Sequence, residues 1–291
     1  MSEQLVYSLS TGRCGTVYLT HLIQQNIAPD RGRVYHERVG FPHFGINTPD
    51  ASHLTTFNQV GNAPNVARFF QRKFERDLGT PQPTHVELSH FLGKAGLVEN
   101  LAYLDGRARV DLIALRRDPY KIAWSFINRF DFINNGFTWL FSLDPAYRNV
   151  IVPSAPFREA GMFGSAVWYV AEMFARISYY RSLVESELPW IHWHETRLEE
   201  IIEPAGSIDL LNALGFETEP ESLIIPEKQN ETKQEFFGEK EAAFTRKLMD
   251  RLFGDPDALG RAFFESGRRL AKHPQIVATP KTSTAAMVPA T

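Results

Sequence analysis

The first 25 residues hold the pattern that most limits how this chain can fold. A short, mostly apolar run from Leu5 to Leu9 leads into a turn with two glycines, and apolar residues then recur at helical spacing from Thr16 to Gln25. The pattern predicts a strand, a tight loop and a helix. Where this order recurs, the strands form one sheet with helices packed on it.

The order recurs along the rest of the chain. Pro64 and Gly79 bracket one amphipathic segment, and Asp118 and Pro119 are a suitable N-cap and first residue for another helix. Helices are predicted at Asn65 to Leu78, from Pro119 onward and at Ser165 to Leu188, and strands around Val86 and Leu88, at Val110 to Leu115 and at Trp190 to Trp193. Alternating strands and helices predict an α/β fold with a mostly parallel sheet and helices on both faces.

The C-terminal part reads as helical additions to the same fold. Short helices are predicted at Ile208 to Leu214, Glu239 to Leu252 and Pro256 to Lys272. They either cap the α/β unit or form a small helical lobe, within a single domain of residues 1–276 whose additions span about 205–276. The tail, residues 277–291, has too little bulky apolar surface to offset chain entropy and is expected to be disordered.

Composition excludes several classes of function. A formal charge of -3 and a pI near 6.3 give no general attraction to nucleic acid. The single cysteine cannot form an internal disulfide, and no apolar stretch reaches the roughly 18 to 20 residues of a membrane span. The first residues lack the basic and apolar regions of a secretory signal. A cytoplasmic protein without a membrane span or a nucleic acid partner is expected.

The loop between the first strand and helix has the chemistry of an anion site. A helix N-terminus directs backbone N–H groups at one spot, and Gly12 and Gly15 let the backbone close around oxyanions. Arg13 adds a permanent charge and Thr16 a hydroxyl donor. An ordinary strand-to-helix turn would have a similar sequence, so the loop alone does not decide between an anion site and a plain turn.

Two other chemistries for this loop are disfavoured. The nucleotide-triphosphate loop needs a lysine directly after its last glycine, whereas Thr16 follows Gly15 here, which argues against a conventional ATPase or kinase. Cys14 has the helix N-terminus and Arg13 beside it, which would favour a thiolate nucleophile, but the loop holds no further cation. The preferred interpretation is that Cys14 is a small residue filling a tight turn.

A second pair of residues suits a phosphate group. Arg117 ends a predicted strand, and Ser125 lies about two turns along the following helix. Either residue alone would more readily pair with a surface carboxylate or solvent. Together, and with the glycine loop earlier in the chain, they form two anion-binding motifs.

With both motifs in this order, the chain resembles the sulfotransferases that use 3'-phosphoadenosine 5'-phosphosulfate. The resemblance covers about residues 4–216 and implies a P-loop NTPase-like three-layer fold. It implies that Arg13 to Val17, with Gly12, surround the 5'-phosphosulfate, where Cys14 replaces the usual serine. It also implies that Arg117 and Ser125 hold the 3'-phosphate. The Arg-Lys-Gly segment that many members use to complete the nucleotide clamp is absent, which leaves the adenosine-side contacts near residues 228–240 open.

Sulfuryl transfer to an alcohol needs a base near the attacking hydroxyl and positive charge at the leaving phosphate. The resemblance implies a base at the end of the strand near residue 88, where this chain offers both Glu87 and His90, with Glu87 slightly favoured. Arg13 is the candidate for stabilising the leaving phosphate. No metal is required. Either Glu87 or His90 could instead cap the following helix.

Residues near the acceptor are predicted in two places. His36 and Glu37 follow another strand-like segment and are similar to a His-Glu pair of some bacterial members. Phe130 and Trp139 belong to an aromatic stretch that forms either a lid over the acceptor or part of the core. Aromatic faces would suit a lipid, polyketide, phenol or sugar, and the sequence does not choose among them.

The leading hypothesis is therefore a transferase that moves a sulfuryl group from 3'-phosphoadenosine 5'-phosphosulfate to a hydroxyl of a small-molecule, carbohydrate or lipid acceptor. A kinase-like, nucleotide-dependent phosphotransferase and a non-catalytic nucleotide-binding module of the same fold are the alternatives. The identity of the acceptor and the oligomeric state stay open.

Overall fold

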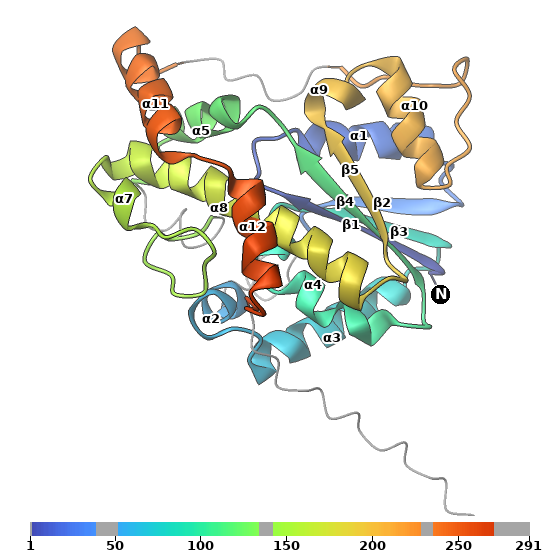
Figure 1. Cartoon of the computed structure of the whole chain (residues 1–291). Coiled ribbons are helices and arrows are strands. Elements are labelled where there is room, and N and C mark those ends of the chain that lie inside the picture. The colour runs from blue at the N-terminus through green and yellow to red at the C-terminus, as the bar shows by residue number, and fades with distance from the viewer. Residues whose placement is uncertain (1, 39–51, 134–141, 228–234, 271–291) are drawn as a thin grey trace, which may run out of the picture.

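The computed structural model describes residues 2–38, 52–133, 142–227 and 235–270. Within them, five parallel strands form one sheet in the order β2-β3-β1-β4-β5. Their bounds are β1 (Gln4–Ser10), β2 (Gly32–His36), β3 (Thr84–Leu88), β4 (Arg109–Arg116) and β5 (His192–Arg197). With helices on both faces of this sheet (Figure 1), the predicted α/β class is confirmed.

The helices form the two outer layers. Figure 1 shows α1, α9 and α10 together on one face and α3, α4, α8 and α12 on the other. Their bounds are α1 (Thr16–Asn26), α2 (Ser52–Val60), α3 (Pro64–Leu78), α4 (Leu97–Asn100), α5 (Pro119–Ile127), α7 (Ala155–Arg158), α8 (Gly161–Glu187), α9 (Leu198–Ile201), α10 (Pro204–Ala213), α11 (Glu239–Leu252) and α12 (Pro256–Glu265). None of these described helices is long and apolar enough to cross a membrane.

The sequence pattern placed most boundaries within a few residues. Asp118 caps α5 as predicted, because its side chain accepts a hydrogen bond from the Lys121 N–H at 2.8 Å. The strand predicted at Trp190 to Trp193 is wrong in position, since β5 runs from His192 to Arg197. β5 is a half-exposed edge strand, so most of its residues are polar. The prediction instead followed the apolar residues Trp190 to Trp193, and therefore began too early.

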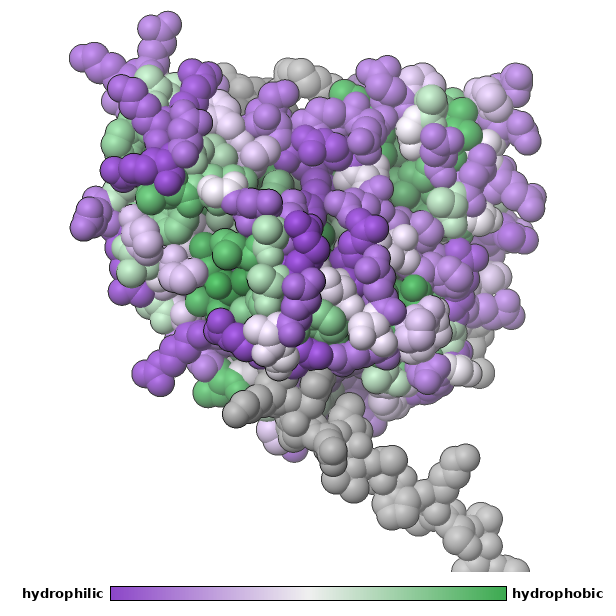
Figure 2. All heavy atoms as spheres, in the orientation of Figure 1, coloured by the Kyte–Doolittle hydropathy of each residue, from purple (hydrophilic) through white to green (hydrophobic). Residues whose placement is uncertain are grey.

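The last helix is shorter than predicted but belongs to the same core. α12 ends at Glu265, and Gly267 then takes a left-handed conformation with φ of 76°. Phe263 and Leu270 are buried in the same apolar cluster as the sheet residues. α12 lies directly on α8, because a Cβ added at Gly260 would collide with the backbone carbonyl of Ala175. Figure 2 shows that the outer surface of this face is mostly hydrophilic. Residues 277–291 lie outside the described residues.

The strand order decides where a ligand can approach the sheet. The chain leaves β1 through α1 toward β2 at one edge, and later returns to β4 on the opposite side of β1. β1 therefore marks the point where the winding reverses, and ligands of open α/β sheets bind beyond the carboxyl ends of strands at such a point. The segments that follow β1, β3 and β4 meet there.

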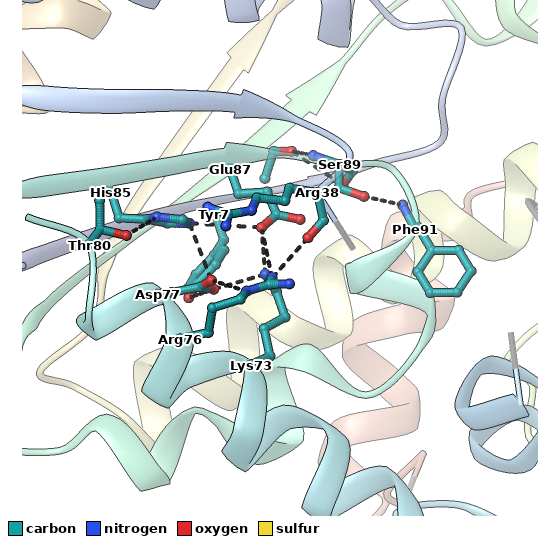
Figure 3. Close-up of polar contacts among 11 residues, drawn as sticks. Tyr7, Arg38, Lys73, Arg76, Asp77, Thr80, His85, Glu87, Ser89 and Phe91 are labelled. Carbon is teal, nitrogen blue, oxygen red and sulfur yellow. Dashed lines mark hydrogen bonds and ion pairs between the residues drawn. The ribbon is translucent and has the colours of Figure 1, made fainter. Parts of the chain in front are cut away.

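A buried group of charged residues joins α3 to the sheet on one face (Figure 3). The ammonium of Lys73 donates to Asp77 Oδ2 at 2.8 Å and to Glu87 Oε2 at 2.5 Å. Tyr7 OH donates to Asp77 Oδ2 at 2.9 Å, and His85 Nε2 lies 3.6 Å from Asp77 Oδ1. All five side chains are buried. These five residues are called the α3 ion cluster below.

Charge balance keeps both carboxylates of the α3 ion cluster ionised. Burial alone would raise the pKa of Asp77 and of Glu87, but the adjacent Lys73 holds both below their ordinary values, that of Asp77 at about 2. Asp77, His85 and Glu87 also offer atoms close enough to one another for a metal ion. The ammonium of Lys73 already supplies the cation between the two carboxylates.

Glu87→Gln is expected to destabilise the fold by about 3 kcal/mol, because it leaves the buried Lys73 with one carboxylate instead of two. Urea unfolding followed by circular dichroism measures the change. Glu75→Gln is the matched control on α3, since Glu75 pairs with Arg107 on the surface and its loss is expected to cost about 1 kcal/mol or less. Equal effects of the two variants would contradict a structural role for Glu87.

Candidate functional site

The site is built on the loop between β1 and α1, which turns through unusual backbone conformations. Gly12, Arg13 and Gly15 have φ of 79°, 56° and 97°. A Cβ at Gly15 would meet Leu198 Cδ1 at 2.5 Å, so glycine is needed there both for conformation and for space. Arg13 accepts a conformation that costs free energy for a residue with a side chain. Such strain is often found at ligand sites.

The N-terminus of α1 faces this loop without a cap from the protein. Gly15 is the N-cap residue, so it provides no side-chain acceptor, and the first turn contains no acidic residue. The backbone N–H groups of Thr16 and Val17, at the start of α1, therefore face the loop together with the partial positive charge of the helix N-terminus. Backbone N–H groups at a helix start are suitable donors for phosphate or sulfate oxygens.

Arg117 and Ser125, the second predicted anion motif, both lie against this loop. Arg13 Nε donates to Ser125 Oγ at 2.9 Å, and Arg117 Nη1 donates to the backbone carbonyl of Arg13 at 2.9 Å. These contacts join residues more than 100 positions apart. The pKa of Arg13 is lowered, first by burial and then by the positive charges of Arg129 and Arg117 nearby. Three guanidinium groups therefore share one region, although Asp131 pairs with Arg129 at 3.3 Å.

Cys14 packs inside the loop. Its side chain is completely buried, and burial raises the pKa of its thiol although the nearby Ser10 and Thr11 act in the opposite direction. A nucleophilic cysteine needs a lowered pKa and access to substrate. Cys14 has neither, so its environment is that of a small packing residue.

The other side of the loop carries an imidazole and a carboxylate. His90 follows β3, and its ring lies on Gly12, where an added Cβ would be 3.1 Å from His90 Cγ. His90 Nε2 lies 3.0 Å from Glu37 Oε1, and His36 Nε2 lies 3.4 Å from Thr16 Oγ1. His36 and Glu37 come from the end of β2, so with the segments after β1, β3 and β4 the ends of four strands contribute to the site.

The charges of this group are set by burial and by one another. Burial lowers the pKa of His90, with the charge of Lys94 acting in the same direction, so the ring is neutral at neutral pH. Burial alone would raise the pKa of Glu37, but His90, His36 and Lys94 together hold it at about 2. A neutral imidazole beside a carboxylate is suited to accepting a proton.

Lys94 is a residue of this site that sequence reasoning missed. Its ammonium is fully buried and lies 2.8 Å from His90 Nδ1, and it donates to Tyr169 OH at 2.9 Å. Tyr169 OH in turn donates to the backbone carbonyl of Thr11 in the loop. The spacing of four residues between His90 and Lys94 places both on one side of a helical turn, which was the one available sign of contact.

Glu87, the favoured base at the sequence level, is not brought to the loop. It belongs to the α3 ion cluster and has no solvent exposure (Figure 3). Its side chain leaves the strand on the face covered by α3, toward Lys73. His90 lies beyond the end of β3, where the strand alternation no longer applies. Of the two candidate bases, Glu87 is therefore directed away from the loop because it lies within β3, whereas His90 reaches the loop because it lies beyond the end of the strand.

The aromatic stretch is only partly described. Phe130 has a φ of 57°, is about one-third exposed and packs against Phe236 and Phe237. Trp139 lies outside the described residues. The backbone N–H groups of Phe236 and Phe237 donate to Asn128 Oδ1 at 2.8 and 3.3 Å. The segment after residue 234 therefore contacts the C-terminal end of α5, three residues beyond Ser125. Residues 228–234 lie outside the described residues.

The solved structures that are similar to this chain include two sulfotransferases. The sulfotransferase from Alicyclobacillus acidocaldarius is 14% identical, with a TM-score of 0.46, and the match covers 92% of this chain and 97% of that one. The sulfotransferase domain from the curacin biosynthetic pathway is also 14% identical, with a TM-score of 0.42 over 90% of each chain. No protein-family model and no curated protein matches the sequence.

Proposed function

We propose that this protein transfers a sulfuryl group from 3'-phosphoadenosine 5'-phosphosulfate to a hydroxyl of a small acceptor. One observation carries the proposal. Arg13, Ser125 and Arg117 meet on one side of the β1–α1 loop, and the His90–Glu37 pair meets the same loop on the other. Anion-binding groups and a proton acceptor therefore flank a single backbone turn.

The donor would use the cationic side of the loop. The N–H groups at the start of α1, with Arg13 and Thr16, suit the 5'-phosphosulfate, and Arg117 with Ser125 suits the 3'-phosphate. Arg13 contacts Ser125 directly, so one guanidinium lies within reach of both ends of the donor. Positive charge there would stabilise the phosphate as the sulfur–oxygen bond to it breaks.

The acceptor would use the other side. A bond forms between the acceptor oxygen and sulfur, and the hydroxyl proton passes to the pair formed by His90 and the carboxylate of Glu37. Glu37 would stabilise the resulting imidazolium. His90 thus replaces Glu87 as the proposed base, because Glu87 is committed to Lys73. The free, buried thiol of Cys14 suits a reducing cytoplasm, which is the proposed location.

Adenosine 3',5'-bisphosphate is expected to bind the full chain with micromolar affinity, and Arg117→Met is expected to weaken binding by about 10- to 100-fold, because a charge-assisted hydrogen bond to phosphate contributes roughly 1.5 to 3 kcal/mol. Titration calorimetry measures both affinities. Arg181→Met is the matched control, since Arg181 is exposed and pairs with Glu185 and Glu195 instead.

Two results would contradict the proposed donor. One is the absence of binding by the wild-type chain at micromolar concentration. The other is tighter, magnesium-dependent binding of ATP, which would support the kinase-like alternative. Bisphosphate binding without turnover of phosphosulfate on any alcohol tested would support the non-catalytic nucleotide-binding module.

Cys14→Ser is expected to leave the affinity for adenosine 3',5'-bisphosphate within about threefold of wild type, because serine has nearly the same shape and Cys14 contributes no accessible thiolate. Calorimetry and the rate of thiol alkylation in the folded chain measure this. Rapid alkylation at neutral pH that abolishes binding would instead indicate a reactive cysteine.

A further inference from the structure

The carboxylate that meets His90 belongs to a residue with an unusual backbone conformation. Glu37 directly follows β2 and has a φ of 54°, in the left-handed region that costs free energy for a residue with a side chain. Its N–H donates to the Leu88 carbonyl at 3.1 Å, so the chain stays paired with β3 up to this turn. The proposed function needs this carboxylate, and contacts elsewhere must stabilise the turn that carries it.

The turn directs two successive side chains to the same site. In a regular strand, successive side chains point to opposite faces of the sheet. His36 Nε2 nevertheless lies 3.4 Å from Thr16 Oγ1, while Glu37 Oε1, from the next residue, lies 3.0 Å from His90 Nε2. Positive φ at Glu37 ends the alternation, so the position of the carboxylate depends on this turn.

A side chain of α3 contacts the turn directly. Arg76 Nη2 donates at 2.9 Å to the carbonyl of Arg38, the residue that follows the turn. Arg76 Nε donates at 3.2 Å to Asp77 Oδ1, which is completely buried. Figure 3 shows the Arg76 guanidinium between these two acceptors. Glu37 thus has its own N–H bonded to β3 and the carbonyl after it bonded to α3.

A second contact attaches the turn to the same part of the fold. The guanidinium of Arg38 lies over the ring of Tyr35, 4.3 Å from its centroid. The Tyr35 ring in turn packs on the ring of His85, with the two centroids 5.1 Å apart. His85 belongs to the α3 ion cluster. Residue 38 is therefore attached to this buried group through its carbonyl and through its side chain.

The ring of His90 is oriented to meet the carboxylate that the turn presents. Lys94 Nζ lies 2.8 Å from His90 Nδ1 and donates to it, so Nδ1 is the acceptor. The proton of the neutral ring is then on Nε2, which donates to Glu37 Oε1. This hydrogen bond forms only where the turn places the carboxylate.

We propose that Arg76 is a positioning residue that holds the left-handed turn at Glu37 and thereby places the Glu37 carboxylate on His90. The link from α3 to the turn follows from the contacts. Its effect on sulfuryl transfer rests on the proposed function, in which the pair formed by His90 and Glu37 takes the proton of the acceptor.

The test follows the His90 Nε2–H signal in a proton–nitrogen correlation spectrum of the full chain labelled with 15N-histidine. A ring N–H bonded to a carboxylate is expected to exchange slowly with water and to give a downfield proton signal. His90→Gln identifies this signal by its absence. Glu37→Gly shows the spectrum without the carboxylate, because glycine accepts the left-handed conformation. Absence of a bonded His90 Nε2–H in the wild-type chain would overturn the proposal without any Arg76 variant.

Arg76→Met removes both hydrogen bonds of the guanidinium. It is expected to abolish the bonded His90 signal, as Glu37→Gly does, whereas Arg68→Met, at an exposed position of the same helix, is expected to keep it. The signal of His194, whose Nε2 lies 2.8 Å from Asp111 Oδ1, is expected in all these variants and reports that the sheet is intact. A bonded His90 signal that persists in Arg76→Met would overturn the proposal.

The double variant separates positioning from a general effect on the fold. Adding Glu37→Gly to Arg76→Met is expected to change the His90 ring shifts no further, because both substitutions remove the same contact. A further change as large as that in Glu37→Gly alone would overturn the proposal, since the carboxylate would still have been in place without Arg76.

Arg76→Lys keeps the test decisive if Arg76→Met does not fold. It retains a positive charge beside Asp77, but offers one nitrogen in place of the two that bond Asp77 and the Arg38 carbonyl. The ammonium is expected to bond the carboxylate, the stronger acceptor, so the His90 signal is again expected to be lost, and an unchanged signal would overturn the proposal. Failure of the proposed function would appear separately, as no bisphosphate binding by a wild-type chain whose His90 signal still depends on Arg76.

Discussion

The position of β1 between β3 and β4 is the constraint on which the rest of the structure depends. Its residues pair in parallel with both neighbours, and its side chains are buried on both faces. The segments that leave the carboxyl ends of these three strands must therefore meet. Without that order, Arg13, His90 and Arg117 would have no reason to share a site, because they are far apart in sequence.

Meeting at one edge still leaves the directions of the side chains to be set, and here backbone conformation and buried charge act together. Positive φ at Gly12, Arg13 and Gly15 turns the loop so that one side faces Ser125 and the other faces His90. The α3 ion cluster fixes β3 from the opposite face of the sheet. The loop is thus held by contacts on both sides, and the residues that contact it come from other parts of the chain.

The sequence allowed the fold to be predicted, and two candidate anion motifs to be identified, because the signals for both are local. Glycines, an N-cap aspartate followed by proline, and alternating apolar runs act within a few residues. The distinction between Glu87 and His90 is not local. It depends on Lys73 facing Glu87 from α3 and on the exact end of β3, and a short strand pattern fixes neither. Lys94 was missed for the same reason, since its partner Tyr169 lies 75 residues away.

The close packing of α12 on α8 has a consequence for how the two ends of the chain depend on each other. On one side of α8, Ala175 lies against Gly260 of α12, and on another side Tyr169, less than two turns earlier, donates to the carbonyl of Thr11. α12 and the β1–α1 loop therefore both pack against the same helix, α8. Loss of α12 would loosen the support of a loop more than 240 residues before it, so α12 is needed for a well-formed β1–α1 loop.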